Sequence, residues 1–385
     1  MEFLQFPGFT LKSSQILIEI PPMTHNKNVL HLVEHLYLGG IERLLEQLAL
    51  HTNDGTRLHF FTYETKSLAG IGKAIQDAGF PVFTYKKSAG RDWNLVRELT
   101  KVIKEHKIDV IHTHDFGPTE YAVLLKMRFP RLRLVHTQHT MHHFIIKPQY
   151  RYFFQFASYF YHQMIGVSGF VKDSIIENCP LVKRSVLTVI PNGVDTRKFV
   201  PTPEVNPAGK SLHMVSIARI SYEKNLEYIF NTCRLLKEAG IPFTFDHAGT
   251  SKTPEPREKL ENFVKQHGLE NNVTMHGFKN DASEILAKGD IFLSSSLREG
   301  HPVAVLEAMA TEKVCLCSDI APHRETSHGV LELYDLQDET ALFNKLKQMH
   351  LDQTSLTERK KQSREIVLKH YSLETMVQNY VDTYK

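Results

Sequence analysis

Two glutamates separated by seven residues are the first candidates for chemistry. Glu299 precedes Gly300, His301 and Pro302, and Glu307 follows in an apolar segment of helical period that begins near Pro302. A strand–turn–helix segment exposes backbone N–H groups, so the amides near Gly300 and His301 could bind an anion. A carboxylate at Glu307 could accept hydrogen bonds from two vicinal hydroxyls. The arrangement suits a sugar nucleotide, although two glutamates alone fit an ordinary solvent-facing turn equally well.

Two basic residues could act on the same ligand from a second loop. Arg219 and Lys224 follow a run of apolar and β-branched residues at 212–217, and Asn225 comes directly after Lys224. In parallel α/β sheets, ligands bind beyond the carboxyl ends of the strands. Two cations there could neutralise a diphosphate without a metal ion. The alternative is a basic pair in a solvated loop.

Two weaker signals lie in the first half of the chain. Gly39 and Gly40 separate a predicted strand from a predicted helix, and paired glycines let a backbone approach a ligand closely. Their spacing lacks the pattern of dinucleotide or Walker loops. His112 and His114 share one face of a predicted strand. Either could contact a ligand at the strand end, or both could pack in the core.

The remaining pattern indicates the elements that position these residues. Short β-branched runs alternate with longer segments of helical period, which predicts βαβ units and parallel sheets. In the first half, the predicted strands are residues 29–33, 58–62, 81–85, 110–114, 132–137 and 164–167. The predicted helices between them include 41–50, 95–106 and 119–127.

A proline-rich segment at 195–210 interrupts both periods and predicts a linker. A second alternating series follows it. Its predicted strands are 212–217, 243–247, 273–276, 291–294 and 314–317, its predicted helices are 224–237, 255–267 and 302–310, and the tail from 339 to 385 is helical in pattern. We therefore expect two doubly wound α/β domains with parallel sheets, over residues 23–198 and 199–367.

The ordered set of segments resembles the retaining glycosyltransferases of family 4, which have the GT-B fold. The residues that carry the resemblance are Glu299 and Glu307 (the family's EX7E motif), Arg219, Lys224, Asn225, Gly39, Gly40, His112, His114, Ser168 and the segment 190–195. The similarity extends over roughly residues 28–380, with the two domains facing each other across a cleft.

The resemblance implies a site for a nucleoside-diphosphate sugar, mostly on the C-terminal domain. Arg219 and the Lys224–Asn225 pair would hold the diphosphate, and Glu307 would bind the ribose hydroxyls. Glu299 would contact the donor sugar, helped by the amides of residues 300–302. UDP is the expected nucleotide because uridine donors are the commonest in the family. Neither a metal ion nor a cofactor is expected.

Further roles follow from the same resemblance. The backbone at Gly277 and Phe278 would face the base, and His114 would reach the donor sugar from the N-terminal domain. Gly39 and Gly40 would border the phosphate and the acceptor. A C-terminal helix at about 368–385 would pack back on the first domain.

The chemistry expected is transfer of a sugar, of the hexosyltransferase type, with retention of configuration. Loss of a nucleoside diphosphate develops negative charge on the leaving oxygen, so cations and helix amides lower the barrier. The catalytic set would be His114, Arg219, Lys224 and Glu299. The departing phosphate itself would take the acceptor's proton. The alternatives are a nucleotide-sugar 2-epimerase and a non-catalytic nucleotide-sugar-binding subunit.

Composition narrows the class of protein. A chain of 385 residues suits two domains, and 42% apolar with 23% charged residues is typical of a soluble globular protein. A net charge of +3 argues against a polyanion-coating protein. Four unevenly spaced cysteines and the lack of a signal peptide or an apolar run of ~18 residues predict a cytoplasmic location. Residues 1–22 precede the first strand, and translation starting at Met23 is a hypothesis.

The charge is unevenly distributed, because residues 121–172 contain no Asp or Glu but seven Lys and Arg residues. Residues 144–161 are also rich in aromatic side chains. Basic and aromatic residues together favour an anionic membrane surface, at the inner face, or an anionic lipid-linked or glycan acceptor, rather than nucleic acid. The acceptor-side candidates are Arg131, Arg133, His139, Lys147 and Ser168.

Two other signals are given less weight. His136, His139, His142 and His143 have no cysteine nearby and match no structural zinc spacing, so no metal site is predicted. Cys315 and Cys317 share a strand face and are expected to be buried small residues rather than a redox pair.

Overall fold

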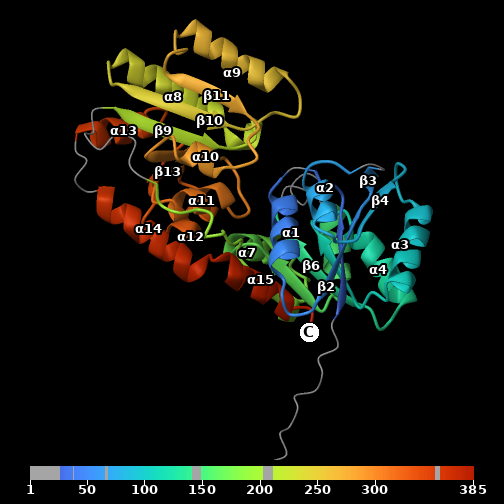
Figure 1. Ribbon diagram of the computed structural model, residues 1–385. Helices are drawn as coiled ribbons and strands as arrows, with labels where there is room; N and C mark the ends of the chain where they lie inside the picture. The colour runs from blue at the N-terminus through green and yellow to red at the C-terminus, as the bar shows by residue number, and fades with distance from the viewer. Residues whose placement is uncertain (1–26, 38, 66–67, 141–148, 203–210, 352–355) are drawn as a thin grey trace, which may run out of the picture.

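The structure is a computed structural model that describes residues 27–37, 39–65, 68–140, 149–202, 211–351 and 356–385. The predicted leader, Met23 and Lys147 lie outside these residues. Two α/β domains are present, each built on a mainly parallel sheet (Figure 1). The predicted fold class is therefore confirmed. Among the described residues, no helix combines the length and the apolarity needed to cross a membrane.

The N-terminal domain has a sheet in the order β3-β4-β2-β1-β5-β6-β7-β8. Its strands are β1 (Asn28–Val33), β2 (Arg57–Thr62), β3 (Glu64–Thr65), β4 (Val82–Lys86), β5 (Val110–His114), β6 (Arg133–Gln138), β7 (Gln163–Gly166) and β8 (Leu187–Val189). Only β3 runs antiparallel, against β4 at the edge. Since the other strands run the same way, their carboxyl ends share one edge of the sheet.

Helices cover both faces of this sheet, as buried parallel strands require. One face carries α3 (Trp93–Glu105), α4 (Thr119–Arg128), α6 (Gln149–Ala157) and α7 (Gly169–Asn178). The other carries α1 (Gly40–His51) and α2 (Gly70–Asp77) (Figure 1). Alternate residues of β1 separate accordingly, with Leu30 and Leu32 in one core cluster and Val29 and Val33 in the other.

The C-terminal domain has an all-parallel sheet in the order β11-β10-β9-β12-β13-β14. Its strands are β9 (Leu212–Ile217), β10 (Phe243–Ala248), β11 (Val273–Gly277), β12 (Ile291–Ser294), β13 (Val314–Ser318) and β14 (Glu332–Tyr334). Helices α8 (Leu226–Glu238), α9 (Glu255–Gln266) and α13 (Ala341–Leu351) pack on one face, and α10 (Ser283–Leu286), α11 (Val303–Ala310), α12 (Ala321–Ser327) and α14 (Leu356–His370) complete the domain.

The chain passes between the domains at two adjacent places. Val194 donates its amide to the carbonyl of Tyr371 (2.9 Å), and Leu373 donates its amide to the carbonyl of Val194 (3.0 Å). A Cβ on Gly193 would lie 2.7 Å from the Ser372 carbonyl oxygen, so the close approach requires glycine. Beyond this contact, α15 (Leu373–Asp382) packs in the N-terminal core beside α1 (Figure 1).

The sequence pattern missed the shortest elements. β3, β8 and β14 contain two or three residues each, too few for an alternating pattern to be recognisable. Pro302 was expected inside its helix, but α11 begins at Val303 and Pro302 precedes it as the N-cap. Cys315 and Cys317 are buried and free, which confirms that expectation.

Candidate active site

Two loops of the C-terminal domain are held together by serine hydroxyls. Ser295, just after β12, donates to the carbonyls of Lys224 (3.0 Å) and Asn225 (2.8 Å), and Ser318 donates to the Ser296 carbonyl (2.6 Å). The amide of Leu297 donates to the Glu223 carbonyl (2.8 Å). These bonds fix the loop that carries Glu299 against the loop that carries Lys224.

Glu299 and Lys224 are paired at this junction. Lys224 Nζ lies 2.5 Å from Glu299 Oε1, and the Ser296 hydroxyl donates to the same oxygen (2.7 Å). Burial would raise the pKa of the Glu299 carboxyl, but the Lys224 charge and the bonds from Lys224 and Ser296 outweigh it and lower the pKa below its ordinary value. Glu299 is therefore an anion at neutral pH.

The turn after Glu299 presents unpaired amides. Gly300 and His301 have no partner for their backbone N–H groups among the described residues. The Ser168 hydroxyl of the N-terminal domain donates to the Gly300 carbonyl (2.7 Å), and a Cβ on Gly300 would lie 1.9 Å from the His139 carbonyl oxygen. The His301 ring is buried against Tyr371, with ring centroids 5.3 Å apart. The unpaired amides can accept an anion.

Glu307, on α11, contrasts with Glu299. Its carboxylate has no hydrogen-bond or ion-pair partner in the described part of the chain. Burial raises its pKa to about 7, although the positive charges of Arg43 and Lys198 act in the opposite direction. A buried carboxylate without a partner is unfavourable. Glu307 is thus ready to accept hydrogen bonds from a ligand.

Arg219 follows β9 and is exposed. Its guanidinium has no hydrogen-bond or ion-pair partner within the described ranges. Glu42, at the start of α1, lies close enough for the Arg219 and Lys252 charges to act on it, while burial raises the pKa of Glu42. Gly39 and Gly40 begin the same helix, and a Cβ on Gly40 would have open space around it. The start of α1 thus faces the cations of the C-terminal domain.

Asn225, Gly277 and Phe278 shape the other side of the predicted donor site. Asn225 has a left-handed backbone (φ 49°) between the Tyr222–Lys224 turn and α8. Gly277 ends β11 with φ 71°, and its carbonyl accepts from Gly249 (2.8 Å). Phe278 is exposed. An exposed aromatic ring and a nearby strand end leave room for a flat ligand, which Phe278 could stack against.

The histidines of the N-terminal domain form a hydrogen-bonded row. His114 Nε2 lies 3.0 Å from His31 Nδ1, and His114 Nδ1 lies 3.1 Å from His139 Nε2. His112 contacts the Tyr384 hydroxyl and the Thr137 hydroxyl, both at 2.8 Å. Burial lowers the pKa of His31 and His139 to about 3, so these rings are neutral. His114 is buried and meets the domain interface through His139.

The same row is the metal-ligand candidate among the described residues. Ring nitrogens of His31, His112 and His114 lie within 4.8 Å of one another. However, both nitrogens of His112 and of His114 already have hydrogen-bond partners. His136 faces the other way, toward Thr113 and Gln138. The geometry is that of a hydrogen-bonded histidine network.

The acceptor-side candidates do not all meet at one place. His139 and Ser168 lie at the carboxyl ends of β6 and β7, against Gly300. Arg133 begins β6 and Arg131 lies just before it, so both are at the opposite edge of the sheet. The structure therefore does not bring Arg131 and Arg133 to the site. Their place in the sequence did not indicate which strand end they occupy.

Several residues at the site were not among the sequence candidates. Arg43 donates to the Asn280 carbonyl of the other domain (3.0 Å). Glu325 accepts from the amides of Gly169 (2.6 Å) and Phe170 (2.9 Å) across the interface. The buried carboxyl of Asp115, whose pKa is raised to about 7 by burial, accepts from the His139 amide (2.9 Å). Glu42 and Arg43 directly follow Gly39–Gly40, and that proximity was the available signal.

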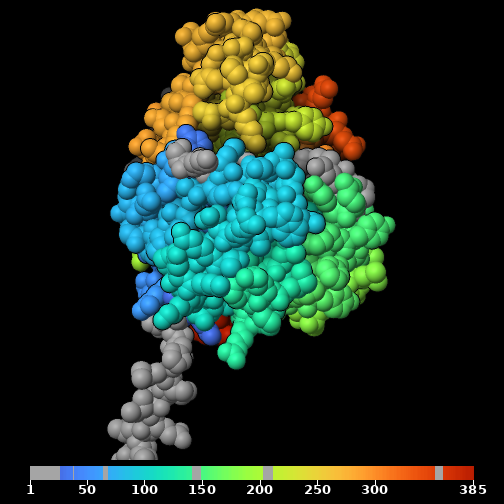
Figure 2. Space-filling model, turned by 90° about the vertical axis from the view of Figure 1, so that its right-hand side faces the viewer, coloured from blue at the N-terminus to red at the C-terminus, as the bar shows by residue number. Residues whose placement is uncertain are grey.

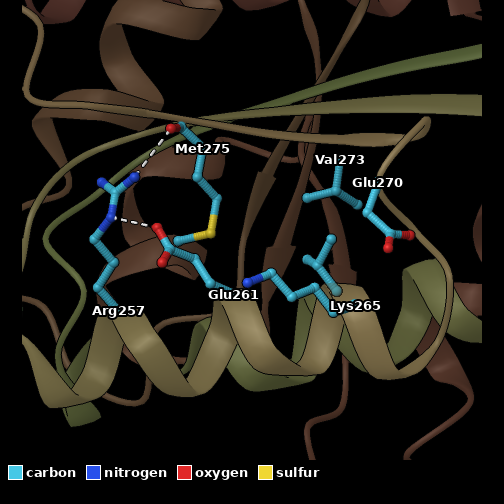
Figure 3. Close-up of a pocket in the computed structure, with 7 residues that line it drawn as sticks. Arg257, Glu261, Lys265, Glu270, Val273 and Met275 are labelled. Carbon is cyan, nitrogen blue, oxygen red and sulfur yellow. Dashed lines mark hydrogen bonds and ion pairs between the residues drawn. The ribbon is translucent and has the colours of Figure 1, made fainter.

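A separate hollow of about 280 Å³ lies between α9 and β11, on the outer edge of the C-terminal domain (Figure 3). Its charges are largely satisfied, because Arg257 donates to Glu261 (2.7 Å) and to the Met275 carbonyl (3.3 Å). Gly277 borders it, since a Cβ there would lie 3.5 Å from Arg257 Nη1. Neither glutamate of the candidate site lines it.

Comparison with known proteins agrees with this geometry. Residues 38–198 match the family model described as Glycosyltransferase Family 4, and residues 202–365 match the one described as Glycosyl transferases group 1. Together the two models cover both domains. The chain is a glycosyltransferase of the family 4, GT-B type.

Curated relatives of this glycosyltransferase include two proteins with lipid-linked acceptors in their names. The UDP-Gal:alpha-D-GlcNAc-diphosphoundecaprenol alpha-1,3-galactosyltransferase of Escherichia coli is 23% identical over 320 residues, which is 77% of this chain and 81% of that enzyme. One component of the phosphatidylinositol N-acetylglucosaminyltransferase of Arabidopsis thaliana is 30% identical over 216 residues, 54% of this chain and 46% of that protein.

Solved structures share the fold over nearly the whole chain. A glycosyltransferase from Rickettsia africae superposes with a TM-score of 0.80 at 17% identity, covering 94% of this chain and 98% of that one. Anabaena Alr3699/HepE, in complex with UDP and glucose, gives a TM-score of 0.77 at 17% identity, covering 92% and 98%. At such identities the likeness shows the fold alone.

Proposed function

We propose that this glycosyltransferase transfers a sugar from UDP-sugar to an acceptor that is joined to a lipid through phosphate, with retention of anomeric configuration and without a metal ion. The observation that carries the proposal is the Lys224–Glu299 pair at 2.5 Å, beside an unpartnered Glu307 carboxylate and the unpaired amides of Gly300 and His301. These groups provide a cation, two carboxylates and two N–H donors at one strand end.

Each group has a role in binding the donor. Lys224 and Arg219 attract the diphosphate, and the Gly300 and His301 amides stabilise negative charge as the leaving oxygen departs. Glu307 accepts hydrogen bonds from the ribose hydroxyls. Glu299, released from Lys224 when the diphosphate binds, accepts from a hydroxyl of the donor sugar. Fixed cations supply the field that a metal ion provides in other transferases, so the reaction proceeds without one.

Retention follows if the acceptor attacks from the side that the diphosphate leaves. The departing phosphate oxygen then takes the acceptor's proton, and no further base is needed. The N-terminal domain presents His139 and Ser168 toward Gly300, so these residues contact the acceptor or the donor sugar from the opposite side. His114 acts through His139, to which it is hydrogen bonded.

The acceptor class is supported by the charge of the N-terminal domain and by the relatives. Residues 121–172 lack carboxylates, which favours an anionic surface. Both relatives described above are named for acceptors in which a phosphate joins a sugar or inositol to a lipid. We infer that the reaction takes place at an anionic membrane surface, in glycolipid or polysaccharide synthesis.

The experiment is donor turnover with radiolabelled UDP-sugars, with and without a lipid extract, preceded by thermal-shift measurements with UDP, GDP and ADP. UDP is expected to raise the melting temperature most, because a ligand that binds only the folded state stabilises it. Label is expected to enter the lipid phase in the presence of EDTA. Label appearing only as free sugar or as an epimerised donor, independent of the extract, would overturn the proposal.

A further inference from the structure

A basic hollow lies at the edge of the N-terminal sheet opposite to the candidate active site. It measures about 410 Å³, and its lining includes Lys126, Arg133, Tyr159, Phe160, His162 and Lys183. Arg133 begins β6 and His162 directly precedes β7, so the hollow is at the amino ends of these strands. His139 follows the carboxyl end of β6, which places the sheet, roughly 20 Å along a six-residue strand, between the two sites.

The groups around the hollow are cations and hydrogen-bond donors. Arg133 donates through Nη1 to the Lys385 carbonyl (3.1 Å), while its buried Nε has no partner among the described residues. A buried donor without a partner calls for a ligand or solvent. Lys126 donates to the carbonyls of Pro130 (2.8 Å) and Leu132 (2.7 Å), which leaves one of its three N–H groups. Lys183 is exposed, and its ammonium has no partner in the described part of the chain.

His162 adds a donor of known tautomer. The Leu134 amide donates to His162 Nδ1 (3.2 Å), so in the neutral ring the proton is on Nε2. Burial lowers the pKa of His162, and the charges that act on it are the positive ones of Lys126, Arg133 and Lys183. An anion in the hollow would offset these like charges.

Exposed apolar side chains lie beside the hollow. Tyr152 and Phe156 are 75% and 56% exposed on α6, Tyr159 follows the helix at 64%, and Leu181 is 70% exposed. The Tyr159 hydroxyl donates to the Leu181 carbonyl (3.4 Å), which places these two together. Residues of this segment form the green part of the N-terminal domain surface in Figure 2. Amphipathic aromatic residues next to cations are characteristic of membrane interfaces.

We propose that this hollow binds the phosphate of an anionic membrane phospholipid, with Tyr152, Phe156, Tyr159 and Leu181 seated at the level of the headgroups. The proposal rests on the membrane contact included in the proposed function and assigns it a specific site. The aromatic side chains favour a lipid over a free phosphate ion, because an ion would contact the hollow alone. Binding here would hold the N-terminal domain at the membrane through residues separate from the donor site.

The test is sedimentation of the full chain with phosphatidylcholine vesicles that contain or lack phosphatidylglycerol. Lys183→Ala and Arg133→Gln should each weaken binding to the anionic vesicles about fivefold, which corresponds to one basic residue at a membrane surface. Lys104→Ala, which removes an exposed lysine from α3, should leave binding unchanged. Tyr159→Ser should weaken binding, whereas Trp93→Ser, at an exposed aromatic residue elsewhere (59%), should not.

Three results would overturn the proposal. Equal binding to neutral and anionic vesicles excludes a phosphate-dependent site, and equal losses in Lys104→Ala and Lys183→Ala reduce the effect to net charge. Saturable binding of inorganic phosphate that Lys183→Ala abolishes, without any preference for phosphatidylglycerol vesicles, assigns the hollow to a soluble phosphate. Stabilisation by UDP is measured on the same variants and should not change. A chain that binds the vesicles but is not stabilised by UDP contradicts the proposed function and leaves the lipid site standing.

Discussion

Lys224 Nζ lies 2.5 Å from Glu299 Oε1. The cation that we assign to the diphosphate is thus held by the carboxylate that we assign to the sugar. Donor binding replaces one partner of each group rather than burying either charge alone, which would be costly. The pair keeps both side chains ordered and charged before the donor arrives.

Lys224→Ala should therefore impair more than phosphate binding. Without its cation, Glu299 is left buried beside Ser296 alone, and its pKa should rise. We expect kcat/KM for the UDP-sugar to fall about 10²- to 10³-fold, the usual cost of removing one electrostatic contact to a transition state. Lys288→Ala, at an exposed lysine of the same domain, serves as the control. Unchanged donor kinetics in Lys224→Ala would remove Lys224 from the site.

Glu307 should make the free protein less stable as the pH rises. Its pKa in the folded protein is raised to about 7 from an ordinary value of 4.5, so the folded state binds more protons between these values. Stability from this group is full below about pH 4.5 and is lost as the pH rises through about 7. Glu307→Gln should remove this loss, on the order of 2 kcal/mol at pH 8.

The same variant should bind UDP more weakly, since an amide cannot replace a carboxylate as a double acceptor. Thermal unfolding of both proteins at pH 5 and pH 8, with and without UDP, measures both effects. A stability difference between the two proteins that does not change with pH would contradict the assignment of the raised pKa. Equal stabilisation of both proteins by UDP would contradict the role in donor binding.

The fold could be predicted largely from the sequence, because the long strands are buried on both faces and read as apolar β-branched runs. The runs at 110–114 and 212–217, for example, coincide with β5 and β9. β3 and β8 could not be predicted, since neighbouring strands determine them rather than their own residue pattern.

The site was predictable only in part. Glu299 and Lys224 follow strand ends that must lie at one edge of a parallel sheet, so their proximity could be inferred. Arg131 and Arg133 were chosen for their charge, but the direction of β6 places them at the opposite edge. Glu325 carried no signal, because its partners are backbone amides of a helix 155 residues or more away in sequence.

Gly300→Ala should separate donor binding from transfer. A Cβ at this position would lie 1.9 Å from the backbone carbonyl oxygen of His139, which cannot move as a flexible side chain does. The domains would be forced apart at the contact that Ser168 makes with Gly300. We expect UDP binding within about fivefold of wild type, because Glu307 and Arg219 are retained, but a loss of transfer of about 100-fold or more, as small misplacements of reacting groups produce. Gly40→Ala, which has open space for its Cβ, should fold normally.

Glu325→Gln should loosen the two domains. The Glu325 carboxylate lies at the N-terminus of α7 and accepts from the amides of Gly169 (2.6 Å) and Phe170 (2.9 Å), where the helix dipole favours a negative charge. A neutral amide of the same shape keeps at most one acceptor there, and the loss should be about 1–2 kcal/mol of interface energy.

We expect the radius of gyration in solution scattering to increase for Glu325→Gln and the KM for donor to rise, with the melting behaviour of each domain preserved. Arg324→Gln is the matched control, since Arg324 lies on the same helix and pairs with Asp319 at the surface. Both variants lose one surface charge, so only the contact with α7 distinguishes them. A radius of gyration that is the same for both variants and the wild type would mean that Ser168, Gly300 and the paired crossings at Val194 and Leu373 hold the domains together without Glu325.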